Sequence, residues 1–261
     1  MKEVFEDRSA LRSRAFGRRS LLALAAGTAL AGAAVLASGC ASDEGATSMA
    51  ATASGSAKAP TLPASDPDPE SPFGVDRNIN METIDQYLGL PGVAYRDARM
   101  LLDSAEYEQI GGHADLEMTL EGFRIVPFPY VGTLQELPVP GAYTGDRLFD
   151  VEWSEDGTVA SATPRYEESM QILADLFPSD GPIMIMCGAG GYAGMTRQLL
   201  IALGWDASLL YNVGGQWDYT GYYPVQLISY DEDGTAHHLF WRADYAAIDF
   251  DDLTPLPTAG R

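Results

Sequence analysis

The chain has 261 residues, of which 46% are hydrophobic and 10% aromatic, which suits one folded domain with appended segments or two small domains. Its 37 acidic residues outnumber the 16 basic ones and give a formal net charge of −21 at pH 7. This charge argues against nucleic acid and against anionic lipid head groups as partners of the folded part, so no nucleic-acid partner is expected.

The first 40 residues have the layout of a secretory signal peptide, in which arginines precede an apolar stretch. The apolar stretch, Leu21–Leu36, is shorter than the roughly 20 residues of a membrane-spanning helix. Arg18–Leu22 resembles a twin-arginine signal, and Ala37–Cys40 resembles a bacterial lipobox. The resemblance implies an exported protein with a lipid on Cys40, attached only by this lipid to the outer face of the bacterial cytoplasmic membrane.

Residues 41–75 are predicted to form a disordered tether, because small and polar residues dominate up to about Pro72. Removal of residues 1–40 takes away six basic and three acidic residues, which leaves 10 basic and 34 acidic ones and a charge of about −24. The simplest use of this charge is solubility outside the cell.

The folded domain is expected over residues 76–255, with strands that alternate with helices. The expected elements up to the cysteine are a helix over 81–88, a strand over 93–97, a helical turn within 101–114, a strand near 123–128, a β-hairpin over 150–162, a helix over 165–177 and a buried strand over 182–186. Those after it are a helix that ends at Gly204, a strand that ends at Gly214-Gly215 and an acidic hairpin within 225–241. This order predicts an α/β fold in three layers, with a mostly parallel sheet, helices on both faces and added hairpins.

Cys187 is the main candidate for a chemically reactive residue in the sequence. With Cys40 bearing lipid, Cys187 has no disulfide partner in the chain. The glycine-rich loop over 188–192 joins a predicted strand to a predicted helix, so we expect backbone N–H groups and the helix N-terminus to face the sulfur. Such a loop would lower the thiol pKa below about 8.5 and stabilise a persulfide anion. A buried, inert thiol is the alternative interpretation.

The stretch around Cys187 resembles the active-site region of rhodanese-like sulfurtransferases, with the motif Cys-x-x-Gly-x-Arg-Ser, then Gly-aromatic, then Gly-Gly. The matching residues are Cys187, Gly190, Gly204-Trp205 and Gly214-Gly215, and upstream Asp97-Ala98-Arg99, Glu106-Tyr107 and Gly112-His113. The resemblance implies a rhodanese-like fold with an insertion at about 114–163. It also implies a nucleophilic cysteine that carries sulfur as a persulfide, from a small sulfur-containing donor to a protein thiol or another acceptor, without a cofactor. The implied persulfide-binding loop is Gly188, Ala189, Gly190, Gly191 and Tyr192.

Two positions of the loop depart from the family pattern. Tyr192 stands where most members have an arginine, and Ala193 stands where they have a serine. A phenol brings no positive charge, so the departure argues against efficient turnover of thiosulfate. A catalytically degenerate module that binds a ligand or a protein partner is therefore the second hypothesis.

Other candidate residues have two interpretations each. Asp97 and Arg99 could support the loops or face substrate, and Arg197 could reach the site or lie on a solvated helix face. Trp217 could form a pocket wall or belong to the core, and His113 is expected to be structural. No metal site is expected, because His237 and His238 lack cysteines or a carboxylate cluster at ligand spacing.

Overall fold

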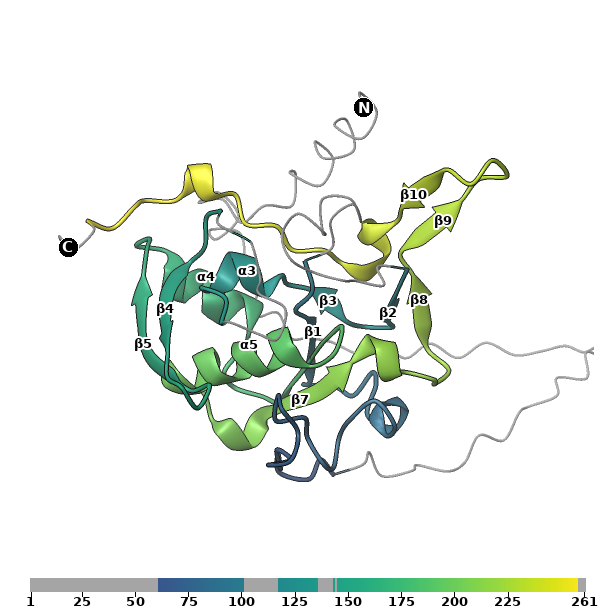
Figure 1. Ribbon diagram of the computed structural model, residues 1–261, viewed down its shortest axis with the longest axis horizontal. Helices are drawn as coiled ribbons and strands as arrows, with labels where there is room; N and C mark the ends of the chain where they lie inside the picture. Colours follow the sequence, from purple (N-terminus) through teal and green to yellow (C-terminus); the bar gives the residue numbers. More distant parts are fainter. Residues whose placement is uncertain (1–60, 101–116, 136–142, 144, 258–261) are drawn as a thin grey trace, which may run out of the picture.

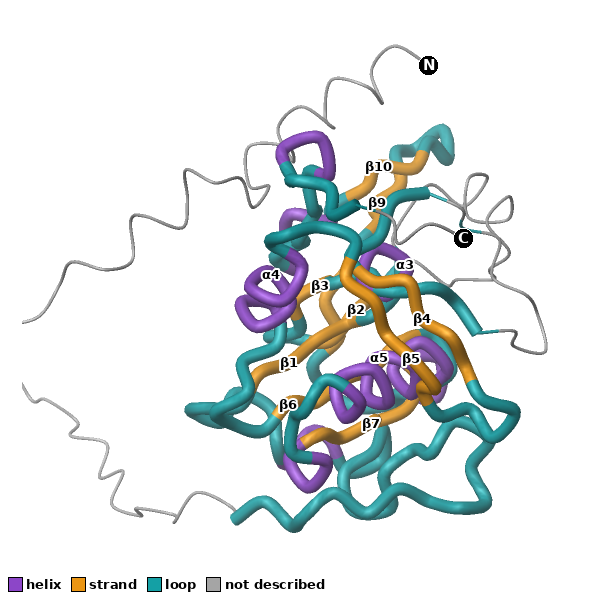
Figure 2. Tube along the Cα trace, turned by 90° about the vertical axis from the view of Figure 1, so that its left-hand side faces the viewer, coloured by secondary structure: helices purple, strands orange, loops and turns teal. Residues whose placement is uncertain are grey.

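The computed structural model describes residues 61–100, 117–135, 143 and 145–257, which form an α/β arrangement around a parallel sheet (Figure 1). The sheet has the strand order β3-β1-β6-β7, and each neighbouring pair is parallel. Figure 2 shows these strands side by side in that order. Their bounds are Ala94–Asp97 for β1, Arg124–Ile125 for β3, Ile183–Cys187 for β6 and Leu210–Gly215 for β7. The prediction of an α/β fold with a mostly parallel sheet is confirmed.

Among the described residues, three α-helices pack on one face of the sheet around the larger hydrophobic core. They are α3 (Phe128–Val131), α4 (Ser169–Leu176) and α5 (Gly191–Ala202). Every residue of β6 is buried, as expected of a central parallel strand. Because side chains alternate along a strand, Ile183, Ile185 and Cys187 belong to the core on the helical face. Cys187 therefore lies in the layer between the sheet and α5.

The opposite face has a smaller core, which includes Met184 and Met186 of β6 and Tyr211 and Val213 of β7. In the part of the chain that the structure describes, its helical cover is a single 3₁₀ turn, η1 (Ile84–Gln86). The predicted helix over 81–88 is therefore shorter than expected, because its N-cap residue makes no side-chain cap and a left-handed glycine follows soon after it. Within these residues, the prediction of helices on both faces holds for one face only.

Three antiparallel pairs surround the sheet. The hairpin of β4 (Phe149–Trp153) and β5 (Val159–Pro164) was predicted, as was that of β9 (Ile228–Tyr230) and β10 (Ala236–His238), which points away from the body of the molecule in Figure 1. The third pair, β2 (Met118–Leu120) with β8 (Pro224–Gln226), was not predicted from the sequence. The remaining 3₁₀ turns are η2 (Ala207–Leu209), η3 (Gln216–Asp218), η4 (Phe240–Ala243) and η5 (Phe250–Asp252).

The range that was expected to be an insertion, 114–163, contributes to the central sheet. Strand β3 lies within it and pairs with β1 in parallel. The C-terminal part of the chain then passes the free side of β3, where the Ala246 N–H donates to the Ile125 carbonyl over 2.9 Å. This part of the range therefore belongs to the central sheet.

Residues 61–76, which we call the N-terminal strap, lie on the domain, although most of this stretch was assigned to the tether. The Ser65 hydroxyl donates to the Leu210 carbonyl over 2.7 Å, and the Tyr211 hydroxyl donates to the Pro63 carbonyl over 2.6 Å. The strap is rich in small and polar residues, and many of its contacts with the domain are hydrogen bonds, which is why its composition did not reveal it.

Several predicted features lie outside the described residues. They are the signal region with Cys40, the tether up to residue 60, and the helical turn with Glu106, Tyr107, Gly112 and His113. None of the described helices has the length and apolar character needed to cross a membrane.

Candidate functional site

Cys187 is the last residue of β6 and therefore lies at the carboxyl end of the parallel sheet, where open α/β sheets bind their ligands. The neighbouring strand β7 has an irregularity in its pairing with β6, so that Gly214 pairs with Met186 and Gly215 with Cys187. Gly214 has a φ of +95°, a left-handed conformation that glycine adopts readily. The shift places the Gly-Gly pair beside the cysteine.

The loop after Cys187 turns backbone N–H groups toward the sulfur, as predicted. The Gly190 N–H donates to Sγ over 3.1 Å, and Gly190 caps α5 with a φ of +93°. The predicted low pKa is wrong, however. Burial raises the thiol pKa above its ordinary value, and the opposing hydrogen bonds from the N–H groups of Ala193, Ala189 and Gly190 do not outweigh this effect. Cys187 is only 4% exposed, which is the burial that raises its pKa.

Two glycines let the segments around the sulfur approach closely. A Cβ on Gly215 would lie 2.0 Å from the Gly188 carbonyl oxygen, and a Cβ on Gly188 would lie 2.9 Å from the indole of Trp217. Trp217 is 47% exposed, and its backbone N–H donates to the Gly188 carbonyl over 3.2 Å. Trp217 therefore forms a wall against the loop rather than part of the core.

Asp97 and Arg99 form a buried ion pair at the end of β1. The guanidinium Nη2 lies 2.6 Å from Oδ2 of Asp97, and the two side chains are 1% and 0% exposed. Arg99 also donates to the Gln216 side chain over 3.2 Å and to the Met118 carbonyl over 2.7 Å. The negative charge of Asp97 adds to the rise in the Cys187 pKa. Of the two interpretations, loop support describes this pair.

Tyr192 turns its ring toward the helical-face core. Its ring centre lies 6.4 Å from that of Phe128, and the side chain is half-buried. Its backbone carbonyl accepts a hydrogen bond from Thr196 over 2.8 Å. Tyr192 thus packs against α3 at the start of α5.

Arg197 does not belong to the site, and it is not on a solvated helix face either. Its Nε donates to the Leu210 carbonyl over 2.9 Å, and Nη2 donates to the Ala207 carbonyl over 3.3 Å. Leu210 is the first residue of β7, at the opposite end of the strand from Gly215, and Ala207 lies in η2 just before it. Partial burial lowers the Arg197 pKa. Arg197 therefore holds the turn that leads into β7.

One residue of the site, Asn212, was missed by the sequence analysis. Its side chain is fully buried in β7 and donates to the Gly190 carbonyl over 3.0 Å. A polar residue within the otherwise mostly apolar stretch Leu209–Val213 was the available signal, since buried amides require hydrogen-bond partners.

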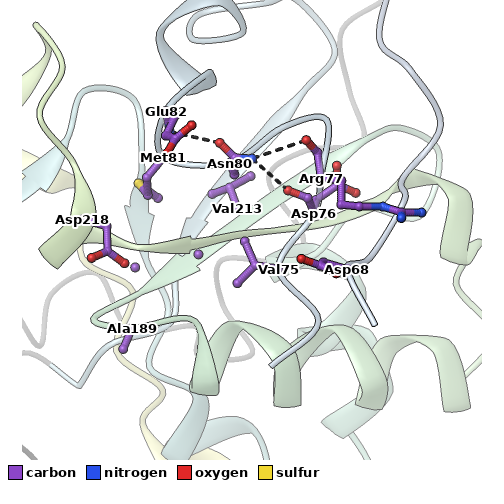
Figure 3. A pocket seen from close by; sticks show the side chains of 12 residues that line it. Asp68, Val75, Asp76, Arg77, Asn80, Met81, Glu82, Ala189, Val213 and Asp218 are labelled. Carbon is purple, nitrogen blue, oxygen red and sulfur yellow. Dashed lines mark hydrogen bonds between the residues drawn. The ribbon is translucent and has the colours of Figure 1, made fainter. Parts of the chain in front are cut away.

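A cavity of about 640 Å³ adjoins the loop on its Ala189 side (Figure 3). It lies between the strap, the segment before η1 and the end of β7, and its lining comprises Asp68, Val75, Asp76, Arg77, Asn80, Met81, Glu82, Ala189, Val213, Gly214, Gly215 and Asp218. Its acidic lining makes it poorly suited to an anionic ligand. Arg77, its one basic lining residue, is paired with Asp66 over 2.6 Å.

The histidine pair on the β9–β10 hairpin has no metal-site geometry. His237 lies 2.6 Å from Asp231 on the exposed hairpin. Among the described residues, no three or more His, Cys, Asp or Glu side chains are grouped to hold a metal ion.

Comparison of the chain with protein-family models, with curated proteins and with solved structures gives no match.

Proposed function

We propose that the protein is a rhodanese-like sulfurtransferase or persulfide carrier in which Cys187 is the nucleophile. The observation that carries the proposal is the hydrogen bond from the Gly190 N–H to the Cys187 sulfur, over 3.1 Å, at the carboxyl end of a parallel sheet. Backbone N–H groups of this kind stabilise negative charge that develops on a reacting atom without themselves having to reorganise.

The proposed reaction has two displacement steps. In the first, the Cys187 thiolate attacks the outer sulfur of a donor, the S–S bond of the donor breaks, and the remainder leaves with the electron pair. In the second, an acceptor thiolate attacks the outer sulfur of the Cys187 persulfide, which restores the Cys187 thiolate. The thiol must first lose its proton, and the N–H groups of Ala193, Ala189 and Gly190 favour the ionised form.

The charge around the loop supports a donor that is neutral or positively charged. The usual loop arginine is replaced by Tyr192, and the adjoining cavity is lined by carboxylates such as Asp68, Glu82 and Asp218. An anion such as thiosulfate would meet unfavourable electrostatic potential there. A low-molecular-weight persulfide with an ammonium group fits this setting better as the donor, and a protein thiol fits it as the acceptor.

Mass spectrometry of the intact protein after exposure to thiosulfate, cysteine persulfide and polysulfide tests the proposal. We expect the mass of one added sulfur atom on the wild type with at least one donor and none with Cys187→Ser. A second variant, Tyr192→Arg, is expected to gain reaction with thiosulfate. A wild type that gains no sulfur from any donor would overturn the proposal.

The burial of the Cys187 thiol favours a second candidate function, that of a catalytically degenerate module that binds a ligand or a protein partner. Cys187 is only 4% exposed, whereas the adjoining cavity is open. On this hypothesis, Cys187→Ala retains function and substitutions in the cavity abolish it.

The proposed cellular place is the outer face of a bacterial cytoplasmic membrane, with a lipid on Cys40. The signal-like and lipobox-like motifs of residues 1–40 support this placement. Metabolic labelling with a fatty-acid analogue tests it: the wild type is expected to incorporate the label and Cys40→Ser is not.

A further inference from the structure

The Asn212 side chain joins three segments of the chain next to Cys187. Its Nδ2 group donates to the Gly190 carbonyl over 3.0 Å and to the Phe73 carbonyl over 2.8 Å. Its Oδ1 accepts from the Gly214 N–H over 3.1 Å. Because the side chain is fully buried, these three bonds compensate for its desolvation. They connect the cysteine loop, the N-terminal strap and the irregular end of β7.

The hydrogen bond from Asn212 to the Gly190 carbonyl involves the same residue whose N–H contacts the sulfur. Gly190 donates its own N–H to Sγ, while its carbonyl accepts from Asn212 and from the Gly194 N–H. The two peptides of Gly190 are linked by a φ of +93°, and glycine has wide freedom to leave such a conformation. Hydrogen bonds at the carbonyl restrict this freedom and thereby the direction of the N–H.

We propose that Asn212 is a positioning residue of the Cys187 site, which holds the Gly190 carbonyl and thereby restricts rotation of the preceding peptide, whose N–H points at the sulfur. This inference rests on the proposed function. The N–H group that Asn212 orients is the one that would stabilise the reacting sulfur in the proposed sulfur transfer. A buried aliphatic side chain at position 212 would fill the space but would supply neither of the two N–H donors of the Asn212 side chain.

The strap in turn fixes Asn212. The Asp76 N–H donates to the Asn212 backbone carbonyl over 2.8 Å, and the Phe73 carbonyl is the second acceptor of the Nδ2 group. A Cβ on Gly194 would lie 2.8 Å from the Phe73 carbonyl oxygen, so α5 and the strap are already in close contact there. The amide therefore has a defined orientation, with Nδ2 toward the two carbonyls and Oδ1 toward the N–H.

Titration of Cys187 in two variants tests the inference. Asn212→Asp keeps the shape of the side chain but cannot donate to either carbonyl when ionised, and Asn212→Leu keeps the bulk without adding charge. The readout is the chemical shift of the Cys187 Cβ against pH, assigned by its loss in Cys187→Ser. In both variants we expect the midpoint to rise by about one pH unit, which corresponds to about a tenfold smaller thiolate fraction at a fixed lower pH.

Ser169→Ala is the matched control, because Ser169 is also a fully buried polar residue with two hydrogen-bond partners in the backbone. It lies in α4, away from the loop, and its replacement is expected to lower stability without moving the Cys187 midpoint. An unchanged midpoint in both folded Asn212 variants would overturn the inference.

The wild-type protein supplies a second measurement if the variants do not fold. We expect the Gly190 backbone amide and the Asn212 side-chain amide resonances to move with the same midpoint as Cys187, and to be insensitive to that pH range in Cys187→Ser. An Asn212 amide that stays fixed while Cys187 titrates contradicts the inference. Neither measurement uses a sulfur donor, so failure of the proposed sulfur transfer is detected separately, by mass.

Discussion

Gly215 has less room for a side chain than any other glycine beside the cysteine, and this makes a sharp prediction. Its φ of −119° suits any residue, yet a Cβ would lie 2.0 Å from the Gly188 carbonyl oxygen and 2.4 Å from the Ala189 Cα. Gly204 differs in both respects: its φ is +102°, a conformation that L side chains rarely adopt, but a Cβ there would meet open space. We expect Gly215→Ala to lower the free energy of unfolding by about 3 kcal/mol, and Gly204→Ala by about 1 kcal/mol.

Urea denaturation of the two variants measures this difference. Because the Gly215 variant must displace the cysteine loop, its Cys187 midpoint is also expected to change, whereas that of the Gly204 variant is not. Equal costs for the two substitutions would mean that the loop moves aside easily, against the close packing seen here.

The raised pKa of Cys187 predicts how its contribution to stability depends on pH. The folded state favours the neutral thiol, so this contribution is fully present below the pKa of the unfolded chain, about 8.5. It is lost as the pH rises through the higher pKa of the folded state. The stability advantage of the wild type over Cys187→Ala is therefore expected to shrink between about pH 7 and pH 10. Denaturation at a series of pH values checks this, and an advantage that grows over that range contradicts it.

The N-terminal strap depends on one buried carboxylate, that of Asp76. It accepts from the Ser65 hydroxyl over 2.9 Å and from the N–H groups of Asp66, Asn78 and Ile79 over 2.6, 2.9 and 2.9 Å. Asp76→Ala removes all four acceptor contacts and is expected to lower the free energy of unfolding by about 3 kcal/mol. Cleavage by a protease within residues 61–76 should become faster, as followed by mass spectrometry.

Asp68→Ala serves as the control for this prediction. Asp68 is in the same strap, and within the described part of the chain its carboxylate accepts only from the exposed Glu70 N–H, over 3.0 Å. It is expected to leave the unfolding free energy nearly unchanged. If both substitutions have the same small effect, the strap is not held through Asp76.

The elements that the sequence predicted well are those with an apolar pattern long enough to be distinctive. Strand β6, helix α5 and the β4–β5 hairpin agree with their predicted ranges within a few residues. The strand predicted near 123–128 is present as β3 but has only two residues, and the helix predicted over 81–88 is reduced to the 3₁₀ turn η1. Elements this short do not contain a full period, so the sequence overestimated their length. The strap has no apolar pattern from which to be recognised, and its hydrogen bonds reach distant parts of the chain.

The candidate site was predictable in part, for a related reason. A cysteine between a buried strand and a glycine-rich helix start indicated the N–H groups that face Sγ. The burial that raises the Cys187 pKa, and the partners of Arg197 and Asn212, arise from segments that are remote in sequence. A local pattern specifies which groups are present near a residue, but not how completely distant segments exclude water from it.

The strongly acidic chain makes a prediction about the whole molecule, independent of any proposed substrate. With a net charge of −21, and with Asp68, Glu82 and Asp218 in the cavity beside the loop, the potential around Cys187 is expected to be negative. Such a potential lowers the local concentration of anions and leaves neutral molecules unaffected. Salt weakens it, because the Debye length falls from about 30 Å at 0.01 M to about 3 Å at 1 M.

Alkylation of Cys187 by the anion iodoacetate and by neutral iodoacetamide measures this effect. At about 0.01 M salt we expect the ratio of the iodoacetamide rate to the iodoacetate rate to exceed the ratio for free cysteine by about tenfold. At about 1 M salt the two ratios should converge. Burial slows both reagents on the same thiol, so it largely cancels in the ratio, and Cys187→Ser identifies the modified site. A ratio equal to that of free cysteine at low salt would show that the acidic residues do not select against anions at this thiol, and the preference for neutral or cationic donors would lose its basis.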